Sequence, residues 1–477
     1  MSSFLNPFNV KYGEVNGCMK DLQIENIVRT IYSDASKKDR IVELLSNICI
    51  DKETIIYRQE ILKDFMFNRA LYYDFLEQTE QMKKCFRNYN ATCTALSKSR
   101  IRSDSSITET SMILKDFSQS IKLLIKIYHT LDHLLKNNTI SSNGLRKLKD
   151  EIDYIINKEE FNLLESKCDQ LIDSVGAFAF QTVLDDRLIP QETKYIIETG
   201  KYQEERVSIF KRKAVVTGNV ELNSKSQEDF KSLLIDSFYK IVSLFEDIFE
   251  YFFEKISFIH EEILFFDFGI KLYDKMWERN INSIFPEIGE ETEYKNVYDP
   301  YLVVMYAHEN YSERIYGNDV EISKENDVLV VGNNNSGKTV LLRTIGINQV
   351  FAQSGLFVPA TKATVGLVNE IVTIFSGEEK DTDNGGRFEK EVIEISEIID
   401  KVNTKSLVII NEIFQSTFAA DGMDALFNVL DYFSNIHVKW VAVTHLLGIL
   451  DRKNSFCKPI DVYTTTCKEE KYKIKKV

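Results

Sequence analysis

Apolar residues recur three and four positions apart through most of the chain before about residue 295, which predicts amphipathic helices. Two such patterns run through Ile121, Leu124, Ile125, Tyr128, Leu131, Leu134 and Leu135, and through Leu233, Leu234, Phe238, Ile241, Leu244, Phe245, Ile248 and Phe252. Proline, which interrupts helices, occurs only once between Pro7 and Pro286. The helices of this part are therefore expected to be long.

A different pattern interrupts the helices at about residues 176–222. Residues 178–184 and 194–198 are short runs rich in β-branched and aromatic side chains, and they flank turn-forming residues and Pro190. Such runs are typical of paired strands. We expect a small β insertion between two long helical arms.

After about residue 295, short apolar strands alternate with helical segments. Residues 328–331, 371–375, 407–410 and 440–444 are the expected strands, and the alternation predicts a mostly parallel sheet. The predicted fold class is therefore multidomain. Residues 1–295 form a mainly α-helical part with the β insertion, and residues 296–477 form an α/β domain.

The amino-acid composition limits which cellular compartments and which binding partners are expected. The chain has 59 basic and 73 acidic residues, a net charge of −14, which argues against a surface that is basic throughout but leaves room for a local basic groove. The seven cysteines include no C-x-x-C pair, so neither a zinc site nor a disulfide framework is indicated. The first residues lack the pattern of a signal peptide, and acidic residues interrupt the most apolar stretch, residues 245–270. We expect a cytoplasmic protein.

A phosphate-binding loop follows the strand at 328–331. It comprises Gly332, Asn333, Asn334, Asn335, Ser336, Gly337, Lys338 and Thr339, and a helical pattern begins directly after it. Glycines at this spacing let backbone N–H groups turn toward phosphate oxygens. Lys338 is expected to reach the β- and γ-phosphates, and the Thr339 hydroxyl to ligate Mg²⁺. The sequence therefore predicts ATP and Mg²⁺ as ligands.

Two further strands end in polar residues. Glu412 follows the strand at 407–410, where its carboxylate can deprotonate the attacking water as a general base. Asn411 precedes it as an oxygen ligand for Mg²⁺ that carries no charge, so weak Mg²⁺ binding or slow turnover is expected. His445 follows the strand at 440–444 and is interpreted as a γ-phosphate sensor or proton relay.

These motifs, in this order, resemble the ATPase domain of the MutS family of DNA mismatch-repair proteins and their relatives, within the ABC-type P-loop NTPases. Besides the phosphate loop and Thr444-His445, the resemblance rests on the segment from Gly385 to Glu391 and on the run from Asn411 to Gly422. Upstream, residues 51–64 resemble the family's helical core and residues 262–265 the end of its lever helix. The resemblance implies a helical core and lever, ATP hydrolysis, and a homodimer formed through the ATPase domains. It also implies that Gly385, Gly386, Arg387 and Phe388 form a signature that completes the partner's site.

The departures from the family pattern shape the expected function. The core-like segment begins near residue 20, which leaves no room for the family's mismatch-binding and connector domains, so mismatch reading is not expected. About thirty residues follow His445, too few for the family's C-terminal dimerisation module. Gly386 occupies the position where the family usually has serine.

Three functions remain open from the sequence. The first is an ATP-driven dimeric clamp on duplex or branched DNA. Its candidate DNA contacts in the β insertion are Lys201, Arg206, Lys211, Arg212 and Lys213. The second is an ATP-switched regulator or scaffold that acts on a protein partner, which the charge of −14 favours. The third, a nucleotide-binding protein with little hydrolysis, rests on Asn411.

Overall fold

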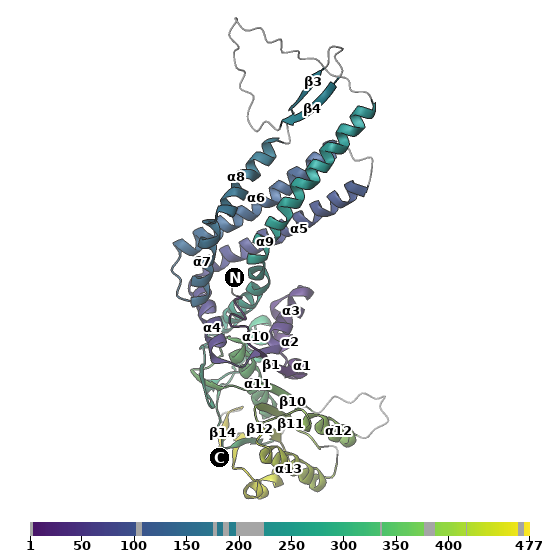
Figure 1. Cartoon of the computed structure of the whole chain (residues 1–477). Coiled ribbons are helices and arrows are strands. Elements are labelled where there is room, and N and C mark those ends of the chain that lie inside the picture. Colours follow the sequence, from purple (N-terminus) through teal and green to yellow (C-terminus); the bar gives the residue numbers. More distant parts are fainter. Residues whose placement is uncertain are drawn as a thin grey trace. The chain divides into compact units, whose positions relative to one another are not determined.

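The computed structural model describes residues 3–101, 107–174, 179–184, 190–196, 224–333, 336–375, 387–415, 417–465 and 472–477 (Figure 1). The chain divides into two compact units. The first contains residues 69–140 and 145–261, and the second contains residues 2–68, 141–144 and 262–477. These units are defined by contacts and are not divided at residue 295, so the domain boundary expected there remains a prediction.

The first unit is built from long helices, as the apolar pattern predicts. They are α5 (Arg69–Ile101), α6 (Ile107–Asn137), α7 (Asn143–Ile156), α8 (Glu159–Ser174) and the part of α9 (Ser224–Glu278) before residue 262. The Tyr128 hydroxyl on α6 donates a hydrogen bond to the carbonyl of Phe252 on α9 at 2.8 Å. The ring of Tyr89 on α5 stacks on that of Phe249, with centroids 4.0 Å apart. Aromatic packing therefore holds α5, α6 and α9 together.

The predicted β insertion contains a pair of strands. β3 (Ala179–Leu184) pairs antiparallel with β4 (Pro190–Ile196). The sequence predicts a turn at Pro190, whereas β4 begins at this residue. A proline is tolerated as the first residue of a strand, where its missing N–H is not needed.

An eight-stranded sheet forms the centre of the second unit. Its strand order is β14-β13-β8-β12-β11-β10-β1-β2, and the five pairings from β13 to β1 are parallel. The strands are β1 (Tyr12–Asn16), β2 (Asn47–Cys49), β8 (Asp327–Val331), β10 (Glu370–Phe375), β11 (Ser406–Asn411), β12 (Lys439–Thr444), β13 (Ile460–Thr465) and β14 (Ile474–Lys476). The four strands expected from the sequence are confirmed, and so is the mostly parallel sheet.

Two strands of this sheet, β1 and β2, are not predicted from the sequence. β1 pairs in parallel with β10, with Glu14 opposite Glu370, and β2 pairs with β1. A strand of five residues and one of three carry too little periodicity to be recognised alone. The place of β1 is fixed by β10, more than 350 residues away, and β2 joins the sheet through β1, so local patterns show neither strand.

Helices cover both faces of the sheet. They are α1 (Cys18–Asp21), α2 (Ile24–Ile31), α3 (Ala35–Ser46), α4 (Lys52–Phe67), α10 (Pro300–His308), α11 (Lys338–Ser354), α12 (Arg387–Ile399), α13 (Ala419–Asn435) and the 3₁₀ helix η1 (Leu447–Ser455). Val408 and Ile410 of β11 share a buried cluster with Leu430 of α13. Ile409, which points to the opposite face, meets α11 at Gly346. The central strands are therefore buried on both faces.

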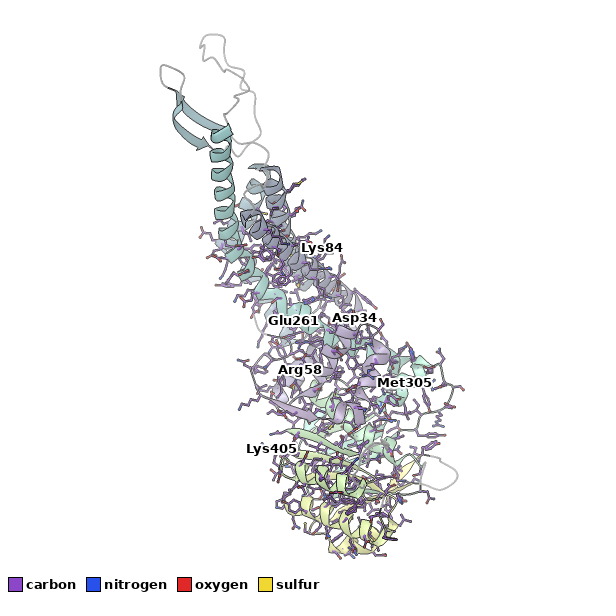
Figure 2. All side chains as sticks on the ribbon, turned by 90° about the vertical axis from the view of Figure 1, so that its right-hand side faces the viewer. Asp34, Arg58, Lys84, Glu261, Met305 and Lys405 are labelled. Atoms are coloured by element: carbon purple, nitrogen blue, oxygen red, sulfur yellow. The ribbon has the colours of Figure 1, made fainter. Side chains whose placement is uncertain are left out.

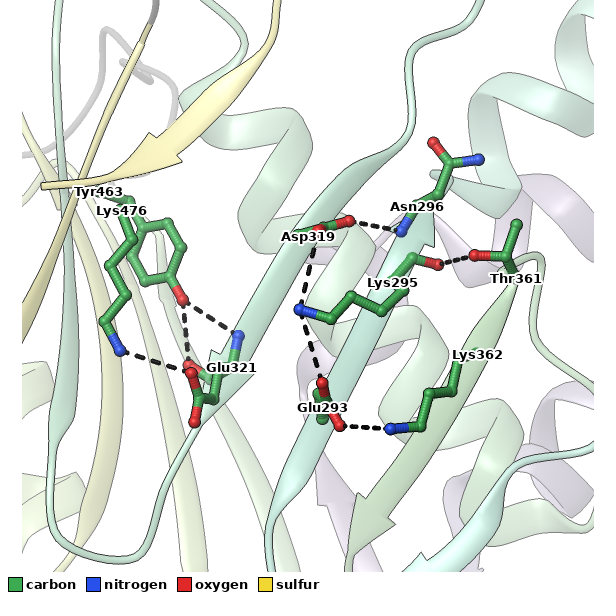
Figure 3. A network of polar contacts seen from close by, with 9 residues as sticks. All are labelled: Glu293, Lys295, Asn296, Asp319, Glu321, Thr361, Lys362, Tyr463 and Lys476. Atoms are coloured by element: carbon green, nitrogen blue, oxygen red, sulfur yellow. Dashed lines mark hydrogen bonds and ion pairs between the residues drawn. The ribbon is translucent and has the colours of Figure 1, made fainter.

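A second, four-stranded sheet has the order β5-β9-β6-β7. It comprises β5 (Glu287–Gly289), β6 (Thr292–Val297), β7 (Asn318–Ile322) and β9 (Lys362–Gly366). Figure 3 shows its exposed face, where Glu293 pairs with Lys362 at 3.0 Å and with Lys295 at 3.5 Å. Exposed pairs of this kind add little stability. They mark a solvated face.

Buried polar contacts tie the N-terminal segment to α11 within the second unit. Arg58, labelled in Figure 2, is 3% exposed. Its guanidinium donates hydrogen bonds to the carbonyls of Leu5 and Ser354 and to the hydroxyl of Tyr12. Ser354 is the last residue of α11, so Arg58 closes that end of the helix. Within the described parts of the chain, no helix is both long and apolar enough for a membrane span.

Candidate nucleotide-binding and ATPase site

The predicted phosphate loop connects β8 to α11, so the strand and the helix that the sequence predicts on either side of it are present. α11 begins at Lys338, directly after Gly337. Gly337 has a φ of 92°, a left-handed conformation that suits glycine, and the ring of Tyr472 lies 3.4 Å from where a Cβ would stand. The first turn of α11 presents backbone N–H groups that no preceding helical turn uses. Such a helix start is well suited to bind phosphate.

Lys338 and Glu412 are in direct contact. The Lys338 side chain is only 3% exposed, and its Nζ donates a hydrogen bond to the Asn333 carbonyl at 2.9 Å. The same Nζ lies 3.3 Å from Oε1 of Glu412. A buried ammonium needs oxygen partners, and a γ-phosphate is one that can replace or join them.

Thr339 and Asn411 also meet. The Thr339 hydroxyl donates a hydrogen bond to Oδ1 of Asn411 at 3.1 Å. Mg²⁺ takes oxygen ligands and usually keeps several waters, so two protein oxygens together with phosphate oxygens suit it. Both oxygens here are neutral. The pair therefore fits a Mg²⁺ site. This site has one negative charge fewer than it would have with aspartate in place of Asn411.

Sheet order brings these residues to a single edge. β8, β12 and β11 are parallel neighbours, with Val331 opposite Thr444 and Val443 opposite Asn411. The Glu412 N–H donates to the Val443 carbonyl at 3.0 Å, which extends the pairing by one residue. Carboxyl ends of adjacent parallel strands form the usual ligand crevice of such sheets.

Two polar atoms near this edge suit a polar ligand. The Ser336 hydroxyl and Nδ1 of His445 are buried and have no hydrogen-bond partner among the residues that the structure describes. Buried polar atoms are almost always paired, so such atoms invite an explanation. A triphosphate offers oxygens that accept from a hydroxyl and from a ring N–H. The residues present therefore fit ATP.

The loop after Glu412 has an unusual backbone. Glu412 has a φ of 51° and Phe414 a φ of 62°, both left-handed and both uncommon outside glycine, asparagine and aspartate. Each such residue costs about 1–3 kcal/mol and persists only when its surroundings hold it. The Phe414 N–H donates to Oε2 of buried Glu391 at 2.8 Å. The sequence alone predicts no role for Glu391, because nothing local shows which backbone group a carboxylate on a helix will meet.

Some predicted site residues lie outside the described part of the chain. They are Asn334 and Asn335 of the phosphate loop, Gly385 and Gly386 of the signature, and Lys201, Arg206, Lys211, Arg212 and Lys213. Arg387 begins α12, but its side chain is likewise outside. Phe388 is 37% exposed, and its ring contacts that of Phe414 with centroids 5.3 Å apart.

Comparison with known proteins identifies the domain that contains the predicted nucleotide site. The MutS domain V model matches residues 328–476. "Endonuclease MutS2" of Lactobacillus helveticus (strain DPC 4571) is 31% identical over 135 residues, 28% of this chain and 17% of that protein. "DNA mismatch repair protein MutS" of Petrotoga mobilis (strain DSM 10674 / SJ95) is 25% identical over 252 residues, 51% of this chain and 30% of that protein. "MutS protein homolog 4" of Mus musculus is 26% identical over 237 residues, 48% of this chain and 23% of that protein.

The matched segments span less than a third of each of these relatives. The matched domain contains the phosphate loop, the Asn411-Glu412 strand end and His445. Residues 328–476 of the chain therefore match a MutS domain V, and proteins named MutS, MutS2 and MutS homolog 4 are among its relatives.

Proposed function

We propose that this chain is a Mg²⁺-dependent ATPase that works as an ATP-switched dimeric clamp on DNA. The observation that carries the ATPase assignment is the contact of Lys338 with Glu412 beside the Thr339–Asn411 pair. Four side chains from two motifs meet there at one sheet edge. This is the set of groups that phosphoryl transfer to water needs.

In the proposed mechanism, the N–H groups of the phosphate loop and Lys338 bind and orient the phosphates. Glu412 takes a proton from the attacking water, and the oxygen of that water forms the new bond to the γ-phosphorus as the bond to the β-phosphate oxygen breaks. His445 donates a hydrogen bond to the γ-phosphate. Thr339 and Asn411 would hold Mg²⁺, which would supply positive charge to offset that of the phosphates.

Dimerisation completes each site in this proposal. The signature from Gly385 to Phe388 of one chain meets the γ-phosphate held by the other, so the two ATPase domains close when ATP is bound. Closure then changes the position of the helical core and lever around the DNA. The candidate contacts to the DNA phosphates are the five basic residues from Lys201 to Lys213.

A second function keeps the same ATP-switched dimer but acts on a protein instead of DNA. The net charge of −14 favours it, since DNA repels a protein of this charge except at a local basic groove.

Equilibrium binding to homoduplex, mismatched, branched and single-stranded DNA at several salt concentrations, with and without ATP, separates the two functions. The clamp is expected to bind duplex or branched DNA with an affinity that ATP changes and that falls steeply with salt. Absence of DNA binding at low salt in both nucleotide conditions would favour the protein partner.

A further inference from the structure

The turn that carries the proposed general base is held from outside the nucleotide site. Glu412 and Phe414 both have left-handed backbone conformations, two residues apart. A phenylalanine gains nothing locally from this conformation, because its side chain cannot hydrogen-bond to the nearby backbone. Contacts at Phe414 therefore help to keep the turn in place, and Glu412 is part of this turn.

Three contacts hold Phe414. Its N–H donates to Oε2 of Glu391 at 2.8 Å, and its ring packs on Phe388 at 5.3 Å. Its carbonyl lies against Gly422 near the start of α13, where an added Cβ would come within 2.5 Å of the oxygen. The hydrogen bond is the one directional contact of the three, and a carboxylate acceptor makes it strong.

Glu391 is suited to this task. It is 5% exposed and sits one helical turn after Arg387 on α12. The same first turn of α12 carries Phe388, the last residue of the predicted signature. A displacement of this turn therefore acts on Phe414 through both the hydrogen bond and the ring contact, and through Phe414 on Glu412.

We propose that Glu391 is a positioning residue for the ATPase reaction, which fixes the Glu412 turn to the start of the signature helix. This rests on the proposed function, in which Glu412 is the general base. When the signature of one chain engages its partner's nucleotide, Glu391 transmits the position of α12 to the base of its own chain. The two composite sites of a dimer are thereby coupled through one buried carboxylate in each chain.

The test compares Glu391→Ala, Glu391→Gln and the control Glu397→Ala in the full-length chain. Glu397 lies on the same helix but is exposed. Removing the acceptor is expected to lower single-turnover hydrolysis about 10- to 100-fold while ATP affinity stays within about threefold, because the phosphate contacts are untouched. The glutamine amide oxygen can still accept the Phe414 N–H, so Glu391→Gln is expected to keep at least about a third of the rate.

A double variant, Glu391→Ala with Glu412→Gln, tells a positioning role from a merely structural one. If Glu391 acts through Glu412, the double variant hydrolyses ATP no more slowly than Glu412→Gln alone. Wild-type hydrolysis by folded Glu391→Ala, or a further independent loss in the double variant, would overturn the proposal. Wild-type hydrolysis by Glu412→Gln would instead refute the assignment of the general base, and so the two failures are distinguishable.

Discussion

The two ends of α11 each hold a buried cation, but the two cations are held differently. At the C-terminal end, Arg58 donates to the carbonyls of Ser354 and Leu5 and to Tyr12. At the N-terminal end, Lys338 has the Asn333 carbonyl at 2.9 Å and Glu412 at 3.3 Å. Both residues are 3% exposed. The two cations are therefore equally buried but have different kinds of partner: Arg58 donates to neutral oxygens, whereas Lys338 also has a carboxylate.

Helix electrostatics accounts for the difference. The C-terminal end of a helix carries partial negative charge, so a cation there is stabilised, and Arg58 also donates to the carbonyl of Ser354, the last residue of α11. The N-terminal end carries partial positive charge, so Lys338 stands where a cation is unfavourable and an anion is favoured. Arg58 belongs to a contact that folding completes. Lys338 belongs to one that, in our proposal, an anionic ligand completes.

The largest expected effect on folding is at the C-terminal end. Arg58→Leu is expected to lower the free energy of unfolding by about 3 kcal/mol, because the Ser354 carbonyl loses its Arg58 donor and the Leu5 carbonyl keeps only the Tyr12 hydroxyl, at 3.2 Å. Urea unfolding followed by circular dichroism measures it. Lys338→Ala serves as the comparison and is expected to change the same quantity by less than about 1 kcal/mol. Equal losses for the two variants would show that the ends of α11 do not differ in this way.

The next prediction tests whether a second chain completes the nucleotide site at the N-terminal end of α11. Lys338→Ala and Arg387→Ala chains are each expected to be inactive alone. An equal mixture should recover about a quarter of wild-type ATPase activity, because half of the dimers are mixed and each has one intact composite site. Steady-state phosphate release measures the recovery. A mixture as inactive as its components, with mixed dimers demonstrated, would favour a site built from one chain.

The smallest effect is a change of charge beside the N-terminal end. Asn411→Asp puts a carboxylate next to the Thr339 hydroxyl. It is expected to tighten Mg²⁺ binding in the presence of ATP by roughly three- to tenfold, since a charged oxygen holds the cation better than an amide oxygen. Titration of Mg²⁺ against ATPase rate measures this. Weaker Mg²⁺ binding would show that Asn411 serves a different geometry.

The parts of the site that the sequence predicts are those encoded locally. A buried strand, glycines at fixed spacing and a helical pattern follow one another between Val328 and Ser354, so the phosphate loop is readable from the order of residues alone. The same holds for Glu412 and His445, each of which directly follows an apolar strand. Parallel pairing then places their strand ends at one edge of the sheet.

The parts that the sequence does not predict depend on distant partners or on backbone conformation. β1 joins the sheet through β10, whose residues lie more than 350 positions away. The Glu391–Phe414 hydrogen bond exists because Phe414 is left-handed, and Arg58 finds Ser354 because α4 packs on α11. None of these contacts leaves a periodic signal, since each joins single residues that only the completed fold brings together.

Equilibrium titration of the full-length chain with ATP and Mg²⁺ tests most directly whether the N-terminal end of α11 binds the nucleotide. It compares wild type, Lys338→Ala and the control Lys362→Ala, whose lysine is exposed on the small sheet. The account predicts that Lys338→Ala weakens ATP binding by about 100-fold or more with an unchanged melting temperature, and that Lys362→Ala binds as wild type does. Wild-type ATP affinity in a folded Lys338→Ala chain would contradict it.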